Sequence, residues 1–254
     1  MEEIDLDGIP VLCSEPSGSA PGTRGAALWL THLGGSTAQA RPMLERLSAA
    51  GFLAVSFDPP GHGRRGSLDP WQLVGDVLGS FRRRMWPLLG QTTLEALRVL
   101  DWVEERWSAP RTWVAGGVSM GGDVSVALAG IDRRVSRVAA LVATPDWSRP
   151  QMRPLDDPER MLDQGRADAY AQWFFEQLNP STHPARYGRD VALYFLSGAR
   201  DHHVPAGDAE AFRAALVERD PGAADRVVVE IEPEAGHADV DDTWYARAVE
   251  WLAR

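Results

Sequence analysis

The chain has 254 residues, of which 44% are hydrophobic and 24% are charged, so it carries enough apolar material for a sizeable core. Its formal net charge of −10 gives it no electrostatic reason to bind nucleic acid or an anionic membrane, which excludes both as expected partners. Cys13 is the single cysteine, which excludes an intrachain disulfide and a cysteine-based metal cage.

Short apolar runs alternate with segments of helical periodicity along the chain. The Asp7-Gly8 pair between two alternating runs predicts a β-hairpin over residues 2–15 with a type I′ turn. Buried strands are then expected at 26–31, 52–58, 112–117, 137–144, 191–198 and 226–232. Helices are expected at 37–51, 120–130, 167–178, 207–219 and 242–253. This alternation predicts an α/β fold, with a mostly parallel central sheet of about eight strands and helices on both faces.

Two segments depart from the alternation. Residues 69–108 carry two helical segments, which we expect to be separated near Pro87 and Gly90. Residues 146–190 are rich in Pro, Asp and Arg and are too short for a core of their own. The prediction is therefore a single domain over 1–254 with a short helical cap insertion at about 146–190. Its aromatic residues are expected to cover an apolar acyl pocket, namely Trp147, Trp173, Phe174 and Phe175.

A serine stands among glycines in the stretch GGVSMGG, residues 116–122. A buried strand is expected before it and a helix after it, which is the context that a nucleophile elbow requires. On such a sharp turn Ser119 would take a strained backbone conformation, while Gly117 and Gly121 remove Cβ atoms that would clash across it. The following helix would direct backbone N–H groups at the site. Ser119 is the candidate nucleophile, and the alternative is a structural turn with an incidental serine.

The elbow and its surroundings resemble the α/β-hydrolase family. The resemblance runs from ALWLTHLGGS (27–36) through FDPPGHGRRG (57–66) to AGHADV (235–240), and so covers nearly the whole chain. Within the family the sequence is most similar to small bacterial serine esterases related to dienelactone hydrolase and to prolyl-oligopeptidase-type domains. The resemblance implies the α/β-hydrolase fold and a catalytic triad in the chain order serine, acid, histidine.

The acid and the base are expected after the nucleophile in that order. His237 follows the last expected strand, where a loop returns to the carboxyl edge of the sheet, and is the candidate base. Asp201, in GARDHHVP, resembles the family signature Gly-x-x-Asp-x-x-Val-Pro and is the preferred acid. Asp146, in ATPDW, follows the preceding strand and is the alternative acid, although we expect it to cap the inserted segment instead.

Two backbone N–H groups are expected to form an oxyanion hole. One belongs to Met120, the residue after the nucleophile. The other is expected from the loop LTHLGGS, where alignment on the glycines makes Leu33 the donor and leaves Gly34 as the alternative. His32 stands where many family members carry a glycine, so its role stays open.

The other histidines are not expected to act in catalysis: His62 is expected to be structural and His183 to be solvated. His62 lies in a Pro-Gly-His-Gly turn, and His183 lies in the inserted segment. His202 and His203 follow Asp201 directly, but neighbours in an extended segment point opposite ways, so no metal site is expected.

These residues predict a carboxylesterase, that is a carboxylic ester hydrolase, which cleaves small to medium acyl esters through an acyl-enzyme. A thioesterase, a peptidase or a carbon–carbon bond hydrolase would use the same triad, and a non-catalytic ligand-binding protein is a remote alternative. The expected partner is a small-molecule ester, without a cofactor. The N-terminus lacks a signal-peptide pattern and no apolar run approaches the roughly 20 residues that span a bilayer, so a cytoplasmic location is expected. The oligomeric state is not predicted.

Overall fold

The computed structural model describes residues 1–16, 24–66, 69–107, 112–188 and 190–254, and every structural statement below refers to these. Residue 108 of the predicted 69–108 segment and residue 189 of the predicted 146–190 segment lie outside them. The strands are β1 (Glu2–Leu6), β2 (Ile9–Ser14), β3 (Ala26–Leu30), β4 (Leu53–Phe57), β5 (Trp113–Val118), β6 (Val135–Leu141), β7 (Ala192–Gly198) and β8 (Val227–Glu232).

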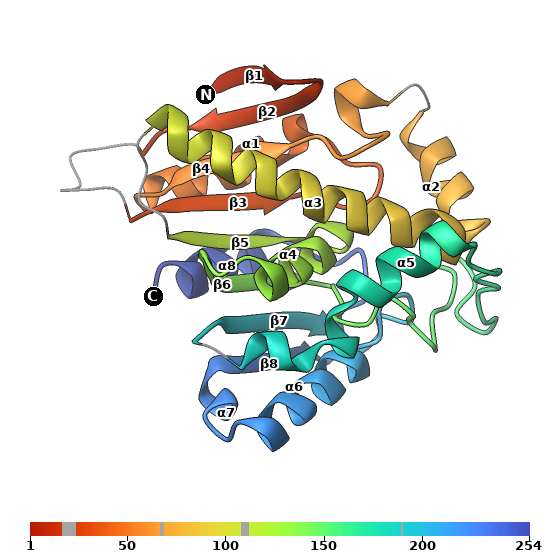
Figure 1. Cartoon of the computed structure of the whole chain (residues 1–254). Coiled ribbons are helices and arrows are strands. Elements are labelled where there is room, and N and C mark those ends of the chain that lie inside the picture. The colour runs from red at the N-terminus through yellow and green to blue at the C-terminus, as the bar shows by residue number, and fades with distance from the viewer. Residues whose placement is uncertain (17–23, 67–68, 108–111, 189) are drawn as a thin grey trace.

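All eight strands form one sheet in the order β1-β2-β4-β3-β5-β6-β7-β8 (Figure 1). β2 pairs antiparallel with β1 and with β4, and the remaining neighbours pair parallel. The β1–β2 turn has positive φ at Asp7 (50°) and Gly8 (84°), as a type I′ turn requires. The predicted hairpin and the mostly parallel α/β sheet are thus confirmed.

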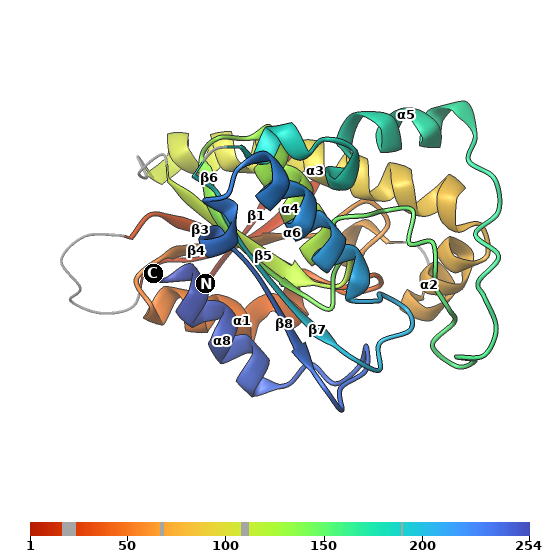
Figure 2. The same cartoon turned by 90° about the horizontal axis from the view of Figure 1, so that it is seen from below.

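Helices cover both faces of the sheet. They are α1 (Thr37–Ala49), α2 (Pro70–Leu78), α3 (Phe81–Trp107), α4 (Met120–Ile131), α5 (Ala169–Leu178), α6 (Gly207–Arg219), α7 (Ala223–Arg226) and α8 (Asp242–Leu252). Figure 2 shows α1 and α8 on one face and α3, α4 and α6 on the other. Each face has its own cluster of buried apolar side chains. The sheet is therefore buried on both sides, which accounts for the near-continuous apolar strands in the sequence.

The prediction of a helix break near Pro87 and Gly90 is wrong. Both residues lie inside the continuous helix α3, and the break comes earlier, between Leu78 and Phe81. Burial of the surrounding side chains stabilises the helix through the proline, which lacks an N–H group. Gly90 has a packing role, since a Cβ there would lie 2.0 Å from Cδ1 of Phe174 in α5. The glycine thus allows α5 to approach α3 closely.

The long connection between β6 and β7 carries α5 and two short 3₁₀ helices, Pro180–Thr182 and Pro184–Tyr187. Figure 1 shows α5 lying beside the end of α3. Phe175 of α5 stacks on Trp86 of α3, with ring centroids 4.2 Å apart. The description of this connection as a cap insertion on a single domain stays a prediction.

In the described ranges, no helix is long and apolar enough to cross a membrane.

Candidate active site

Ser119 sits on a sharp turn between β5 and α4. Its backbone has φ 52° and ψ −118°, a conformation that side-chain-bearing residues rarely adopt, and α4 begins at the next residue. Added Cβ atoms at Gly117 and Gly121 would lie 2.5 and 2.3 Å from the Leu30 carbonyl oxygen of β3. The glycines are therefore required for the turn to fit against β3, and the turn places Ser119 at the carboxyl end of β5.

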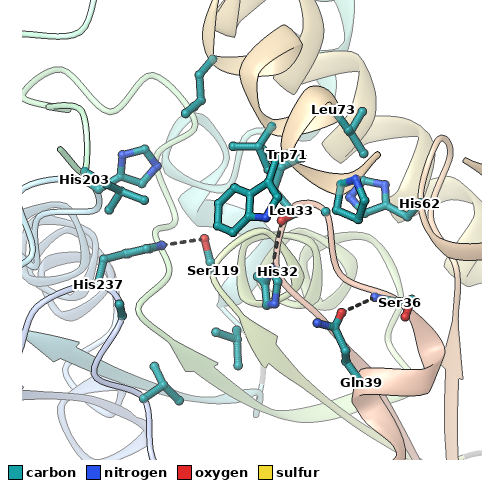
Figure 3. Close-up of a pocket in the computed structure, with 18 of the residues that line it drawn as sticks. His32, Leu33, Ser36, Gln39, His62, Trp71, Leu73, Ser119, His203 and His237 are labelled. Atoms are coloured by element: carbon teal, nitrogen blue, oxygen red, sulfur yellow. Dashed lines mark hydrogen bonds between the residues drawn. The ribbon is translucent and has the colours of Figure 1, made fainter. Parts of the chain in front are cut away.

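The structure brings together the three residues predicted to form the triad. The ring nitrogen Nδ1 of His237 donates to Oδ2 of Asp201 at 2.7 Å, because the carboxylate can only accept. This leaves Nε2 as an acceptor, and it lies 3.1 Å from Oγ of Ser119 (Figure 3). The serine hydroxyl can therefore pass its proton directly to the imidazole.

Hydrogen bonds to the second carboxylate oxygen of Asp201 hold this residue in place. Oδ1 accepts the backbone N–H groups of His203 at 2.9 Å and Val204 at 2.8 Å, and the aspartate is buried. Asp146 does not take this place. Its Oδ1 accepts the N–H of Ser148 at 2.9 Å, which is the local capping role expected for it. Asp201 is therefore the acid that faces His237.

A cavity of about 760 Å³ opens above Ser119. Its walls come from the loops after β3, β4, β5, β7 and β8 and from α2, so it lies at the carboxyl edge of the parallel strands. Among the described residues that line it there is no Asp, Glu, Lys or Arg. The space therefore suits an uncharged molecule.

The aromatic residues expected to cover this cavity do not line it. Trp147 is fully buried, Phe174 packs against Gly90, Phe175 stacks on Trp86, and Trp173 is exposed. Instead, α2 supplies the apolar wall, with Pro70, Trp71, Leu73, Val74 and Leu78, and the β6–β7 connection contributes Leu155. The sequence analysis predicted a helix over the residues of α2, but helical periodicity does not indicate which element faces the site.

The loop after β3 forms one wall beside the serine. Leu33 and Gly34 both line the cavity, and Gly34 has φ 81°. His32 is exposed, and its Nδ1 donates to the Leu33 carbonyl at 2.9 Å, so its ring holds the loop (Figure 3). Met120 follows the serine at the start of α4. The assignment of Leu33 and Met120 as oxyanion donors, with Gly34 as the alternative, stays a prediction.

His203 lies beside the candidate base. Its ring centroid is 5.0 Å from that of His237, in an edge-to-face arrangement, and its Nδ1 donates to the Arg153 carbonyl at 3.0 Å. Burial, with contributions from Arg149 and His237, lowers the pKa of His203 to about 3, so this ring is neutral at neutral pH. The adjacent His202 is exposed, so the two rings diverge as expected. In the described part of the chain, no group of three or more His, Cys, Asp or Glu residues could hold a metal ion.

The sequence analysis did not predict a buried ion pair that lies in the first turn of α4, close in sequence to Ser119. Asp123, in the first turn of α4, pairs with Arg149 of the β6–β7 connection, and both side chains are fully buried. Oδ1 of Asp123 also accepts the N–H of Thr144 at 2.8 Å. Burial raises the pKa of Asp123, while the Arg149 guanidinium counteracts that rise. The sequence does show that Asp123 is a charged residue within a mostly apolar helix, which could have suggested a buried ion pair. Nothing in the sequence identified Arg149 as its partner.

Comparisons with known proteins agree with this fold. A family model described as alpha/beta hydrolase fold matches residues 32–189. The chain is similar to TT1662 of Thermus thermophilus, with 26% identity and a TM-score of 0.76 over 99% of this chain and 95% of that one. It is also similar to Est1E of Butyrivibrio proteoclasticus, solved with ferulic acid bound, with 15% identity and a TM-score of 0.66 over 100% of each chain. The esterase Pf2001 of Pyrococcus furiosus has 16% identity and a TM-score of 0.64 over 99% of this chain and 90% of that one. No curated protein matches the chain.

Proposed function

The chain belongs to the α/β-hydrolase family, and from that premise we propose that it is a serine hydrolase, specifically a carboxylesterase for small to medium, uncharged esters. The observation that carries the proposal is the hydrogen-bonded series from Ser119 through His237 to Asp201, which opens onto a cavity whose described lining holds no Asp, Glu, Lys or Arg. A serine is a weak nucleophile without an adjacent base, and this arrangement supplies the base and fixes its tautomer.

The proposed reaction proceeds in two steps. His237 removes the Ser119 proton as Oγ attacks the ester carbonyl carbon, and the N–H groups of Leu33 and Met120 stabilise the oxyanion. The intermediate collapses, the carbon–oxygen bond to the alcohol breaks, and the imidazolium returns its proton to the leaving oxygen. Water then attacks the acyl-enzyme with His237 again acting as base, which releases the acid and restores Ser119. Asp201 stabilises the imidazolium in both steps.

The preference for esters rests on the cavity and on the neighbouring structures. A volume of about 760 Å³ is within the range of small-molecule sites, and the absence of Asp, Glu, Lys and Arg from the described lining favours a neutral substrate. Est1E and the Pyrococcus esterase support an ester as the bond cleaved. Thioesters, amides and carbon–carbon bonds remain the alternatives for the same three residues. Non-catalytic binding is the remaining alternative, and reaction of Ser119 with a fluorophosphonate probe would argue against it.

Replacement of Ser119 by Ala tests the proposal directly. We expect the S119A protein to lose at least 10³-fold in kcat/KM on p-nitrophenyl butyrate, because no other nucleophile among the described residues is hydrogen-bonded to His237. S119A should also fail to react with the fluorophosphonate probe. The measurement is p-nitrophenol release, beside a panel of ester, thioester and amide substrates of matched acyl chain.

The matched control is S136A. Ser136 lies near the amino end of β6, at the opposite edge of the sheet from the cavity, and its Oγ donates to the Trp113 carbonyl. It should keep wild-type activity. Full activity in S119A would contradict the proposal, and faster turnover of thioesters or amides than of esters would replace the carboxylesterase assignment with one of the alternatives.

A further inference from the structure

Trp71 presents an accessible aromatic ring on the wall of the substrate cavity. It is the second residue of α2, and it lines the same cavity as Ser119 and His237. The residue is 80% exposed, and Figure 3 shows its indole directed into the cavity. The ring surface is therefore available to a molecule that binds there.

The other exposed aromatic side chains in the described ranges pack against a neighbouring ring. Tyr170 and Trp173 both lie edge-to-face on Phe174, with centroid distances of 5.0 and 5.1 Å. Trp71 has no such ring partner among the described residues, and no cationic side chain of that part of the chain lies over its indole. Its aromatic face is thus left uncovered by the folded chain.

The first turn of α2 fixes the position of Trp71. Asp69 caps the helix by accepting the Trp71 backbone N–H at 2.9 Å, and Pro70 occupies the first helical position, for which its φ angle is suited. A Cβ at Gly34 would lie 3.2 Å from both the Pro70 carbonyl oxygen and Cγ2 of Val74, so this turn packs closely on the loop after β3. The indole therefore projects from a turn that is held against the loop beside the serine.

The chemistry of the indole narrows the group that it would bind. Its π face attracts planar aromatic rings and also cations. A cation would lose its hydration on entry, and the described lining holds no Asp or Glu to compensate it. An aliphatic group would gain as much from burial against the leucine and valine side chains of the same wall. An aryl ring is the group for which the indole offers an attraction that these aliphatic side chains lack.

We propose that the ester cleaved at Ser119 carries an uncharged aryl group, and that Trp71 determines this specificity by stacking against the aryl ring. The inference rests on the proposed function, since it names the class of ester that the site takes. A wall that is only apolar would favour a cyclohexyl group over a phenyl group, because cyclohexyl has the larger apolar surface. Stacking on an indole favours phenyl, so the sign of this preference distinguishes the two cases.

The wild-type protein provides the first test. Methyl 3-phenylpropanoate and methyl 4-phenylbutanoate are compared with their cyclohexyl counterparts, and 2-phenylethyl acetate and 3-phenylpropyl acetate with theirs, by acid release at neutral pH. At least two methylene groups separate each ring from the ester, so the ring changes the reactivity of the carbonyl little. We expect kcat/KM to favour phenyl by at least threefold in one or more pairs. Equal rates, or a preference for cyclohexyl, in all four pairs would overturn the inference.

The second test replaces the indole itself. W71L keeps an apolar side chain without an aromatic face, and it should bring the phenyl-to-cyclohexyl ratio to one or below, mainly through a higher KM for the phenyl ester. W71F restores a smaller ring and should restore part of the preference. Because Trp71 is exposed, neither change is expected to unfold the protein. The matched control is W173L, since Trp173 is an exposed helical tryptophan that is not among the described lining residues, and it should keep the wild-type ratio.

The outcomes separate the two proposals. If the wild type cleaves none of these esters, the proposed function fails, and the inference fails with it. If it cleaves them but W71L keeps the full phenyl preference, the function stands and the role of Trp71 is overturned. Faster cleavage of butyrylcholine than of its uncharged isostere 3,3-dimethylbutyl butyrate, lost in W71L, would mean that the indole binds a cation and would overturn the aryl assignment.

Discussion

Single atoms determine whether the residues after β5 can present a nucleophile. A Cβ at Gly121 would lie 2.3 Å from the Leu30 carbonyl oxygen, which belongs to the rigid backbone of β3. The motif was readable in the sequence because all its parts lie within seven residues. Asp201 and His237 were readable for a similar reason, since each follows a recognisable strand. The buried pairing of Asp123 with Arg149 was not, because the two residues lie 26 positions apart and meet only in the folded chain.

Gly121→Ala should damage the site and the fold together. The added methyl group cannot move away from a strand backbone, so the elbow must shift, and we expect a loss of about 1–3 kcal/mol in the free energy of unfolding. Activity on p-nitrophenyl butyrate should fall at least 100-fold, because the Ser119 to His237 geometry depends on that turn. Urea unfolding and ester hydrolysis measure the two effects.

Gly75→Ala is the matched control. Gly75 lies in α2, and a Cβ there meets nothing within 4 Å. Alanine should raise the free energy of unfolding by about 0.5–1 kcal/mol through its better helix propensity and leave activity unchanged. If G121A were as stable and active as G75A, the steric account of the elbow would be wrong.

At the scale of elements, helices and strands were predictable, but the surfaces they present to one another were not. α3 continues through Pro87 because its middle is buried, which overrides the local preference of proline. The apolar cavity wall comes from α2, whereas Trp147 of the β6–β7 connection is buried in the interior, Phe174 and Phe175 pack against α3, and Trp173 is exposed. Both differences arise from tertiary contacts, which amino-acid periodicity does not encode.

The Asp123–Arg149 pair ties the β6–β7 connection to α4. Arg149→Met would leave the Asp123 carboxylate buried without its counter-charge, and we expect it to cost about 3–5 kcal/mol of unfolding free energy. The double variant Asp123→Asn with Arg149→Met should recover most of that loss, because no charge remains to be desolvated. Urea unfolding of the two single variants and the double variant forms a mutant cycle.

A double variant as unstable as Arg149→Met alone would mean that packing of the arginine side chain, rather than compensation of charge, holds the connection. The guanidinium lies 5.4 Å from the Phe81 ring centroid, so such a packing contribution has a visible basis. The cycle therefore assigns the role of this pair, which the sequence analysis did not detect.

At the scale of the molecule, charge and cavity favour the same kind of substrate. The chain carries a net charge of −10, yet no Asp, Glu, Lys or Arg is found among the described residues lining the cavity. The acidic surface repels anions during approach, and the cavity offers them no cation on arrival. A neutral ester meets neither obstacle. The composition establishes that the net charge is negative, but only the folded chain shows that the described lining of the cavity holds no Asp, Glu, Lys or Arg.

This arrangement predicts a specific response to salt. The anionic p-nitrophenyl ester of succinic acid should have a kcat/KM at least tenfold below that of neutral p-nitrophenyl pentanoate at low ionic strength. Raising the salt concentration shortens the Debye length to about 8 Å at 0.15 M, so the long-range part of the repulsion should fade and the rate on the anionic ester should rise. The neutral ester should respond little, which makes it the internal control. The remaining difference at high salt measures the desolvation of the carboxylate inside the cavity, where screening does not reach. A rate on the anionic ester that matched the neutral one, or that fell with added salt, would indicate a cation at the cavity and would contradict an uncharged substrate for Ser119.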